Sequence, residues 1–458
     1  MAARIGKTIF ICQNCSHQVG KWLGRCPECG AWNSLVEEVV AAGPAVIPEG
    51  MLPPRRSHPQ PLVHLAAAPE PRQASGLAEF DRTLGGSVVQ GSAVLVGGDP
   101  GIGKSTLILQ VLDRLSRDGR RGLYISGEES ETQLKLRADR LGLTSPGLLV
   151  ATETCLENII KMVEEVQPAY LALDSIQTLY TAAIPAAPGS LPQVRETAFR
   201  LVQQAKLSGV ATFLIGHVTK EGNLAGPMTL EHLVDTVLYL EGDRSHAFRL
   251  LRTVKNRFGP TQELGVFEMA ETGLVEVANP SALFMAERSL EVPGAVVVPS
   301  LEGSRPILVE VQALVSPSSL ALPRRQSIGV DQGRVSLLVA ILEKRVGLGM
   351  GGQDLFVNVA GGVRLMEPAV DLGVALALAS SYLERPVPAD TLIFGEVGLT
   401  GEVRAVSQPE MRLKEGRKLG FRRALLAGGQ KERLGDFVGL ELLGVDTLAG
   451  AIRKILPG

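Results

Sequence analysis

The residues with the clearest chemistry in this sequence lie in one glycine-rich segment, residues 98–105, which reads GDPGIGKS. It fits the pattern G-x-x-x-x-G-K-[ST], in which glycines let backbone N–H groups turn inward around the phosphates of ATP or GTP. In that pattern Lys104 reaches the β- and γ-phosphate oxygens, and the Ser105 hydroxyl holds Mg²⁺. The expected nucleotide-binding residues are Gly97, Gly98, Asp99, Pro100, Gly101, Ile102, Gly103, Lys104, Ser105 and Thr106.

The segments on either side of this loop are the ones that such a loop requires. Residues 92–97 form an apolar run that predicts a β-strand, and residues 106–116 carry apolar side chains at helical spacing. A strand, a glycine-rich loop and a helix in this order place the phosphates at the N-terminus of the helix. An ordinary glycine-rich turn is the alternative, and the Lys-Ser pair in register argues against it.

Two other predicted strands end in carboxylates that could serve the same site. The apolar strand YLALD ends in Asp174, which we expect to orient Mg²⁺ together with Ser105. Glu128 and Glu129 follow the strand predicted at 122–127, and one of them is expected to act as the general base on the attacking water. Carboxylates at such positions can also cap a turn or a helix. Glu128 is our first choice for the base.

A third apolar strand, predicted over residues 211–217, ends in His217 at the same edge of the sheet. This histidine could sense the γ-phosphate, or it could be a packed bystander. The loop over residues 218–229 has few apolar side chains. Loops in this position often bind a polymer or switch with the nucleotide.

Four of the five cysteines form two C-x₂-C pairs near the start of the sequence. Each pair can present two thiolates to one metal ion, and four sulfur ligands with no open position are typical of structural Zn²⁺. A module this small has almost no core of its own and would depend on the metal to fold. Two redox-active dithiols or four unrelated thiols are the alternatives. The expected zinc ligands are Cys12, Cys15, Cys26 and Cys29.

Composition restricts the partners that the chain can have. Its 458 residues are 45% hydrophobic and carry a formal net charge of −2. Such a charge gives no general attraction to nucleic acid or anionic membranes, so a polyanion would have to be held by local basic groups. No apolar run reaches membrane-spanning length, and there is no signal-peptide pattern. We therefore expect a cytoplasmic protein without a membrane partner.

The order of the predicted elements is that of an α/β protein with several domains. We expect a cysteine module at 1–33, a Pro-rich linker at 34–72, an ATPase domain at 73–277 and a second α/β domain at 278–458. Alternating strands and helices predict a mostly parallel sheet with helices on both faces, and consecutive strands after residue 234 predict an antiparallel edge. The strands expected in the ATPase domain are 92–98, 122–127, 148–152, 169–175, 211–217, 234–240 and 247–254. The expected helices are 104–118, 130–141, 155–166 and 192–208, with an apolar helix at 368–384 in the last domain.

A basic cluster follows the last of these strands. Residues 255–259 read KNRFG, so Lys255 and Arg257 are expected to project from a strand end, with Phe258 before a glycine turn. Such side chains could reach the γ-phosphate held by a neighbouring subunit. They could also grip a DNA strand by charge and stacking, or form only a basic strand end that leads into a turn.

In combination, these motifs resemble the bacterial RadA (Sms) family of recombination and repair proteins, which are RecA-type ATPases. The resemblance covers nearly the whole chain and rests on the cysteine module, the GDPGIGKS loop, the KNRFG pentapeptide and a C-terminal region similar to the Lon protease domain. It implies a RecA-like P-loop core, an N-terminal zinc ribbon and a C-terminal α/β Lon-protease-like domain. It further implies a hexameric motor that uses ATP, Mg²⁺ and Zn²⁺ and acts in homologous recombination. Its partners would be single-stranded DNA, recombination intermediates and a RecA-type recombinase.

The C-terminal region departs from the Lon family at its catalytic residues. The segment 366–372 looks like the one that carries the nucleophilic serine, but the matching residue is Ala369. Lys414 looks like the lysine of the Ser–Lys dyad, and without a serine it has no hydroxyl to activate. The resemblance therefore implies a scaffolding domain without peptidase activity.

Two other function classes were weighed against this interpretation, and only the first remains as an alternative. The first is a regulatory RecA-fold ATPase that acts on a protein partner, and stimulation of ATP hydrolysis by DNA would argue against it. The second is a zinc-dependent protease with an attached ATPase. That class needs an open metal position, which a site of four cysteines does not leave.

Overall fold

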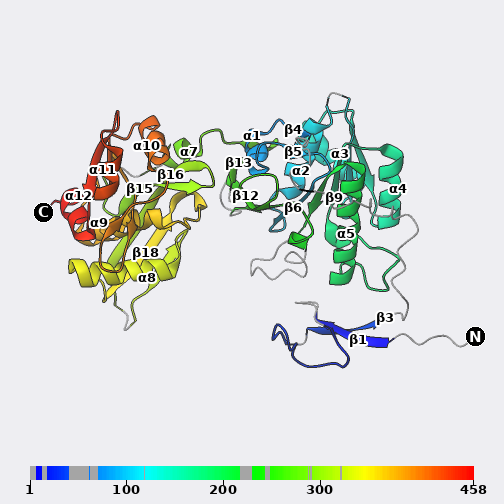
Figure 1. The fold of residues 1–458 in the computed structure, drawn as a ribbon, viewed down its shortest axis with the longest axis horizontal. Coiled ribbons are helices and arrows are strands. Elements are labelled where there is room, and N and C mark those ends of the chain that lie inside the picture. Colours follow the sequence, from blue (N-terminus) through cyan, green and yellow to red (C-terminus); the bar gives the residue numbers. More distant parts are fainter. Residues whose placement is uncertain are drawn as a thin grey trace, which may run out of the picture. The chain divides into compact units, whose positions relative to one another are not determined.

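The chain forms two compact units in the computed structural model (Figure 1). The first unit comprises residues 1–241 and 249–276, and the second comprises residues 242–248 and 277–458. The structure describes residues 7–12, 18–32, 34–40, 61, 71–117, 119–216, 230–242, 248–261, 263–286, 288, 291–319 and 322–457. Among these, no helix combines the length and apolar character needed to cross a bilayer.

The cysteine module is a three-stranded antiparallel sheet in the order β2-β1-β3. Its small core consists of Cys12, Cys26 and Leu35, with Phe10, Val19 and Leu23 packed against it. The last strand pairs along its whole length with β1, so the sheet continues beyond residue 33, into the segment expected as linker. The strands are β1 (Lys7–Cys12), β2 (Gln18–Val19) and β3 (Leu35–Val40).

A nine-stranded sheet forms the centre of the ATPase domain, in the order β14-β13-β12-β11-β6-β10-β9-β7-β8. The strands from β11 to β8 are all parallel, whereas β12 is antiparallel to β11 and β14 to β13. The predicted α/β fold with a mostly parallel sheet is confirmed. The strands are β6 (Ala93–Gly98), β7 (Gly122–Ser126), β8 (Leu148–Thr152), β9 (Tyr170–Asp174), β10 (Ala211–Ile215), β11 (Thr236–Glu241), β12 (Phe248–Asn256), β13 (Leu264–Ala270) and β14 (Gly273–Glu276).

One detail of this prediction is wrong: the antiparallel edge begins at β12 and not at the preceding strand. β11 runs parallel to β6. The connection over residues 216–235 is long enough for a crossover, which parallel neighbours need, although the sequence shows no helical pattern there.

Helices cover both faces of the sheet, as Figure 1 shows for α2, α4 and α5. Along β6, Val94 and Val96 join the core under α2, and Ala93 and Leu95 join the core under α4 and α5. This alternation explains why the strand is apolar at every position. The helices are α1 (Ala78–Thr83), α2 (Lys104–Leu115), α3 (Glu131–Arg140), α4 (Leu156–Val166) and α5 (Leu191–Ser208), with a 3₁₀ turn η2 (Ile176–Thr178) and a short ribbon of β4 (Arg72–Gln73) and β5 (Val88–Val89).

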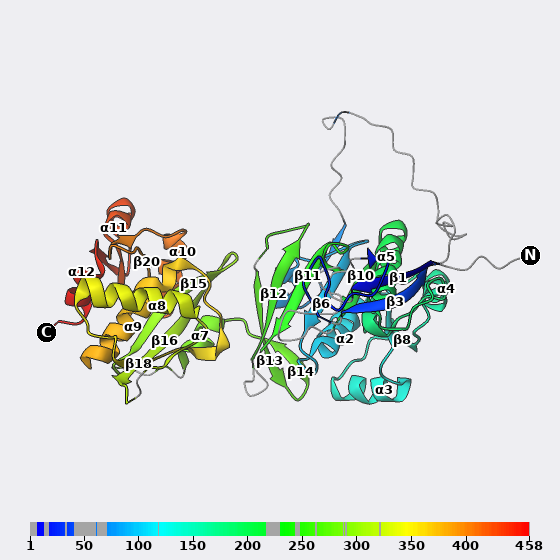
Figure 2. The same ribbon diagram turned by 90° about the horizontal axis from the view of Figure 1, so that it is seen from below.

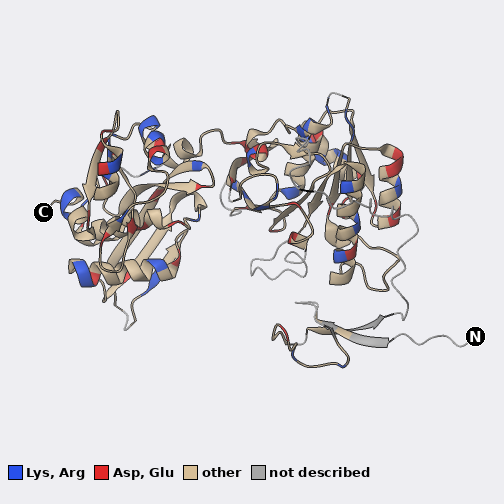
Figure 3. Cartoon of the chain, viewed as in Figure 1, with Lys and Arg blue, Asp and Glu red and all other residues tan. Residues whose placement is uncertain are grey.

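Local sequence signals set the ends of these helices. α3 starts with a capping box, in which Ser130 and Gln133 satisfy each other's backbone N–H groups. α5 has a proline in its first turn and ends at Gly209, whose φ of 75° is the left-handed conformation typical of helix ends. Basic and acidic residues are interspersed along α4 and α5 (Figure 3).

The second unit is a seven-stranded sheet in the order β17-β18-β16-β15-β19-β22-β23. The helix α9 packs against β15 and β16, and α8 packs against α9 (Figure 2). A Cβ on Gly373 would lie 2.1 Å from a methyl group of Val298, so glycine lets α9 approach the sheet closely. The strands are β15 (Ala295–Glu302), β16 (Arg305–Pro317), β17 (Arg325–Ile328), β18 (Gln353–Val359), β19 (Thr391–Ile393), β22 (Arg423–Ala427) and β23 (Glu441–Val445), beside the pair β20 (Glu396–Val397) and β21 (Val403–Arg404).

The expected apolar helix at 368–384 is divided into a 3₁₀ turn η5 (Pro368–Val370) and α9 (Asp371–Leu383). Residues 371–380 are all buried, which explains why the segment is apolar on every side. The other helices are α7 (Pro280–Ala286), α8 (Gln332–Ile341), α10 (Pro409–Lys418), α11 (Gly428–Leu434) and α12 (Leu448–Ile455), with a short π-helix η3 (Leu342–Val346) and a 3₁₀ turn η4 (Ala360–Gly362).

Candidate nucleotide site and zinc ribbon

The glycine-rich loop joins β6 to α2 at the carboxyl edge of the parallel strands. At Gly98 the φ angle is 146°, and a Cβ would lie 2.4 Å from the carbonyl oxygen of Leu240 on the neighbouring strand. Only glycine fits there, because any side chain would collide with backbone. No side chain caps the N-terminus of α2 at Lys104. The N–H groups of a first helical turn have no partner within the helix, and they favour phosphate oxygens.

The ammonium group of Lys104 is buried against the loop, with 3% of the residue exposed. Its Nζ donates to the carbonyl oxygens of Gly98 at 2.8 Å and Asp99 at 3.0 Å. Burial lowers the pKa of Lys104 to about 8, although the carboxylates of Asp174, Glu128 and Asp99 oppose this shift. A phosphate group would supply the negative charge that this desolvated cation favours.

Asp174 is the last residue of β9, and a tyrosine holds its carboxylate in place. The residue is 6% exposed, and its Oδ2 accepts a hydrogen bond of 2.5 Å from the hydroxyl of Tyr124 on β7. Burial and the Asp174 carboxylate raise the pKa of Tyr124 well above its ordinary value, so the hydroxyl keeps its proton at neutral pH. An oxygen ligand suits Mg²⁺, and the Asp174 carboxylate offers one in a fixed orientation. The magnesium roles of Asp174 and Ser105 stay predictions.

The two candidate bases have different surroundings. Ser175 donates a hydrogen bond of 2.6 Å to Glu128, and the Glu128 carboxylate is close enough to Lys104 to raise its pKa. Glu129 instead forms an ion pair with Arg137 of α3. The structure therefore brings Glu128 together with Lys104 and Asp174, and it engages Glu129 with a helix.

Sequence reasoning missed four residues that shape this site: Tyr124, Ser175, Arg137 and Arg249. Tyr124 carried a usable signal, because a tyrosine in an otherwise buried strand needs a partner for its hydroxyl. For Arg249, the sequence offered no signal that it would contact the site. It is a buried residue of β12 whose Nε donates to the carbonyl oxygen of Ile102 in the loop, 147 residues away in the sequence.

The basic side chains of the KNRFG segment lie close to the chain that precedes β11. Lys255 donates from Nζ to the carbonyl oxygens of Glu231 at 2.6 Å and Val234 at 2.9 Å. Burial lowers the pKa of Lys255, and the charge of Arg257 adds to this effect. Arg257 forms an ion pair with Asp235, in which Nη1 lies 3.2 Å from Oδ1.

This segment lies at the edge of the sheet opposite to the nucleotide site. Asn256, at the end of β12, is paired with Thr236, the first residue of β11, whereas Leu240 near the end of β11 is paired with Gly98. These two positions on β11 are separated by roughly 13 Å of strand. Lys255 and Arg257 are therefore remote from Lys104 of their own chain.

Close backbone contact fixes the glycine of the pentapeptide. A Cβ on Gly259 would lie 2.8 Å from the Cα of Gly85, so two glycine turns meet there. Arg72 donates to the carbonyl oxygens of Gly85 at 3.2 Å and Phe258 at 2.9 Å. The side-chain oxygen of Asn256 accepts from the N–H of Phe258 at 3.0 Å. Asn256 and Gly259 thus hold the turn that presents the two cations.

Three of the four expected zinc ligands meet in the cysteine module. The Sγ atoms of Cys12, Cys26 and Cys29 all lie within 4.8 Å of one another, and those of Cys12 and Cys29 are 3.6 Å apart. Thiolates around a tetrahedral Zn²⁺ lie about 3.8 Å apart, so the group fits this ion. The fourth expected ligand, Cys15, lies outside the described residues.

In the second unit, the positions matched to the Lon dyad do not form a pair. Ala369 is buried in η5, and Lys414 is exposed on α10. The buried basic residue of α10 is Arg412, whose guanidinium donates to both carboxylate oxygens of Glu367 at 2.6 Å and to the carbonyl oxygen of Pro299 at 2.5 Å. The charged group near Ala369 is therefore the ion pair of Arg412 and Glu367, and its hydrogen bonds join α10 to β15.

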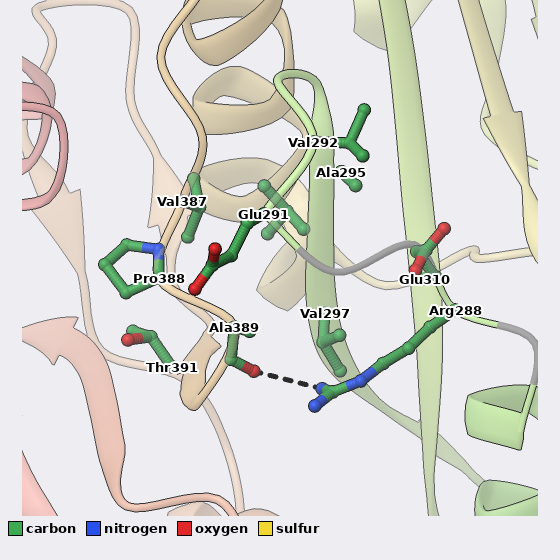
Figure 4. A pocket seen from close by; sticks show the side chains of 11 residues that line it. Arg288, Glu291, Val292, Ala295, Val297, Glu310, Val387, Pro388, Ala389 and Thr391 are labelled. Atoms are coloured by element: carbon green, nitrogen blue, oxygen red, sulfur yellow. Dashed lines mark hydrogen bonds between the residues drawn. The ribbon is translucent and has the colours of Figure 1, made fainter.

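A small hollow in the second unit is unrelated to these groups. It lies between β15 and residues 387–391, and Arg288 spans it by donating to the carbonyl oxygen of Ala389 at 3.0 Å (Figure 4). The guanidinium of Arg288 also lies 5.0 Å from the ring centroid of Phe421.

Two expected parts of the nucleotide site, His217 and the loop at 218–229, lie outside the described residues.

Two family models match the chain. The model described as a rubredoxin metal binding domain matches residues 10–37, the three-stranded ribbon. The ATPase model described as KaiC matches residues 73–148, which include the glycine-rich loop and Glu128. A solved structure of a KaiC-like protein from Pyrococcus horikoshii OT3 is 22% identical and covers 46% of this chain and 100% of its own, with a TM-score of 0.39. At that score the likeness adds nothing to the assignment.

Curated relatives match the chain from end to end. It is 52% identical to the DNA repair protein RadA of Bacillus subtilis (strain 168), with 99% of both chains covered. It is 50% identical to the protein of that name from Halalkalibacterium halodurans, covering 98% of this chain and 99% of the relative. For the Pseudomonas aeruginosa protein of that name the identity is 49%, with 97% and 98% covered. The chain therefore belongs to the RadA family of DNA repair proteins and is an ATPase with an N-terminal zinc ribbon.

Proposed function

We propose that the chain is an ATP-driven motor that acts on single-stranded DNA and recombination intermediates, and that it promotes strand exchange and branch migration as a ring-shaped homo-hexamer. The observation that carries this proposal is the position of Lys255 and Arg257. Both lie at the edge of the sheet opposite to Lys104 of the same chain. Arg257 keeps 52% of its side chain exposed beside Asp235, so its guanidinium can reach a DNA strand or the nucleotide of a neighbouring subunit, and Lys255 anchors the same turn to the chain before β11.

In this proposal, each residue of the nucleotide site has a role in ATP hydrolysis. Lys104 and the N–H groups at the start of α2 bind the phosphates, and Ser105 and Asp174 bind Mg²⁺. Bound Mg²⁺ would neutralise charge that develops on the phosphates. Glu128, held by Ser175, orients the attacking water and takes its proton. Tyr124 keeps the Asp174 carboxylate in one orientation.

Coupling between ATP and DNA runs through the KNRFG turn in this proposal. Lys255 holds two carbonyl groups of residues 231–234, the segment that leads into β11. A shift of this segment would therefore move Lys255, and with it Arg257. The cations would act across a subunit boundary, as arginine fingers do.

The test is ATP hydrolysis and strand movement by a Lys255→Ala variant. We expect ATP binding to be unchanged and DNA-stimulated branch migration to be lost. Lys161→Ala, which removes an exposed lysine of α4, is the matched control and should behave as the unmodified chain. Branch migration at the unmodified rate by Lys255→Ala would refute the coupling role.

Two further parts of the proposal concern partners and the second unit. We propose that a RecA-type recombinase loads the strands on which the motor acts.

We also propose that residues 278–458 form a scaffold without peptidase activity, because Ala369 offers no nucleophile and Lys414 is exposed. Release of labelled peptide that is lost in a Lys414→Ala variant would contradict the second point.

A further inference from the structure

The zinc ribbon exposes both tryptophans of the chain. The sequence contains two, Trp22 and Trp32, and they are 56% and 72% exposed. The core of the ribbon is built on Cys12, Cys26 and Leu35 without either indole. Because an indole is among the largest apolar side chains and is highly buried on average, two exposed indoles in one small module indicate a binding surface.

The two indoles border one small space above Gly24. A carbon atom in the position of a Cβ on Gly24 would lie 3.8 Å from Cη2 of Trp22 and 3.9 Å from Cζ3 of Trp32. These are the separations at which carbon atoms attract one another most, about 3.5–4.0 Å. Among the described residues that are not its chain neighbours, no other atom lies within 4 Å of that position. We call this space, bordered by Trp22, Gly24 and Trp32, the indole slot.

Backbone conformation does not explain the glycine in the indole slot. Gly24 is absent from the residues with positive φ, so an L-residue could adopt its conformation. Glycine leaves open the position that borders both rings. A ligand that contacts both indoles can occupy this position, whereas the backbone conformation does not require a glycine there.

Cationic groups lie beside the indole slot. Lys21 and Arg25 are exposed and flank Trp22 and Gly24 in the sequence. The guanidinium of Arg25 lies 5.8 Å from the ring centroid of Trp32, within the range of a cation–π contact. Its Nε donates to the carbonyl oxygen of Gly30 at 2.8 Å, which holds the charge next to the slot.

We propose that the indole slot binds a base of single-stranded nucleic acid, with Lys21 and Arg25 contacting the adjoining phosphates. Aromatic faces stack with every base and therefore bind strands without regard to sequence. The two cations supply the local attraction that a net charge of −2 does not provide. A base inside a duplex has its faces covered by its neighbours, so the slot selects unpaired strands. The binding of an unpaired strand is argued from the ribbon alone, and only the assignment of that strand as DNA rests on the proposed function.

Intrinsic fluorescence tests the proposal directly, because both tryptophans border the slot. We expect oligo(dT) to quench the tryptophan emission of the zinc-loaded full chain in a saturable way, and added salt to weaken the effect. A blunt duplex of the same length should leave the emission unchanged. Lys104→Ala, without nucleotide binding, should be quenched like the unmodified chain, so that failure of the slot and failure of the motor are distinguishable.

Two glycine substitutions separate the slot from the rest of the ribbon. Gly24→Val fills the space and keeps both indoles and all charges, so we expect the affinity for labelled oligo(dT), measured by anisotropy at equal zinc content, to fall roughly ten-fold. Gly20→Val is the matched control, because no atom of the described residues lies within 4 Å of its Cβ position and its φ is also not positive. It should bind as the unmodified chain does.

A second variant keeps the test decisive if Gly24→Val loses zinc. Trp32→Ala removes an exposed ring that lies outside the ribbon core, and the same ten-fold weakening is expected. The proposal is overturned if oligo(dT) leaves the emission unchanged, or if Gly24→Val and Trp32→Ala bind normally. It is also overturned if a peptide of residues 41–73, which is rich in proline, quenches the emission at lower concentration than oligo(dT). That result would assign the slot to proline-rich protein segments.

Discussion

At the scale of single residues, the main feature of the nucleotide site is a desolvated cation between carboxylates. Lys104 has few contacts with water, and its pKa falls to about 8. Asp174 and Glu128 are held by Tyr124 and Ser175, respectively. A site of this kind is prepared for an anionic ligand before the ligand arrives.

The lowered pKa of Lys104 predicts that nucleotide affinity depends on pH. The phosphates of ATP favour the protonated ammonium, so binding above pH 8 must first restore the proton. With a pKa of about 8 in the free chain, affinity should fall about ten-fold between pH 7 and pH 9. Titration with a fluorescent ATP analogue measures this. Lys104→Arg keeps its charge over the whole range and should give a flat profile. A flat profile for the unmodified chain would contradict the prediction.

The different surroundings of the two glutamates predict different kinetic effects. Glu128→Gln should lower kcat about 100-fold or more, because the general base is lost, while ATP still binds. Glu129→Gln should keep most of the activity and reduce the free energy of unfolding by about 1 kcal/mol, since it weakens the pair with Arg137. Steady-state ATPase assays and denaturant titrations measure both effects. A greater loss of kcat in Glu129→Gln would show that the assignment is reversed.

At the scale of elements, the sheet separates phosphate binding from the KNRFG turn. Parallel strands place their carboxyl ends together, which collects the P-loop, Glu128 and Asp174 at one edge. Because β12 is antiparallel to β11, its end returns to the opposite edge and carries Lys255 and Arg257 there. The reversal of one strand thus decides that these cations face a different partner.

The contact between two glycine turns predicts a specific cost for a small substitution. Gly259→Ala would place a Cβ 2.8 Å from the Cα of Gly85, and backbone cannot move aside as a side chain can. We expect the free energy of unfolding of the first unit to fall by about 1–3 kcal/mol, and DNA-stimulated ATPase activity to fall with it. In the part of the chain that the structure describes, no atom lies within 4 Å of the Cβ that Gly352→Ala would add, so this variant is the control. Equal melting temperatures for the two variants would contradict the close contact.

At the scale of the whole molecule, the proposal requires that one subunit completes the site of another. Mixing two inactive variants tests this. Lys104→Ala subunits retain Arg257, and Arg257→Ala subunits retain Lys104, so mixed rings contain sites with both residues. We expect each variant alone to hydrolyse ATP at least about 1,000-fold more slowly, and the mixture to regain activity. Mixed rings without recovery would indicate that Arg257 acts on DNA and not on a neighbouring nucleotide.

The sequence by itself determined the features that depend on local pattern. The P-loop is defined by glycines, a lysine and a hydroxyl at fixed spacing, and its flanking strand and helix follow from apolar periodicity. The predicted elements of the ATPase domain agree with β6 to β12 and α2 to α5 within a few residues. The cysteine spacing likewise pointed to the ribbon, where Cys12, Cys26 and Cys29 meet.

Only the tertiary structure decided which distant groups touch. The pairing of Glu129 with Arg137, the contact of Arg249 with the P-loop and the burial of Arg412 instead of Lys414 all depend on how elements pack. Periodicity places a residue on a face of its own element, but it does not specify which part of the chain covers that face. The direction of β11 was wrong in the prediction for the same reason. Strand direction follows from the path of the connection through space, and local sequence carries no record of that path.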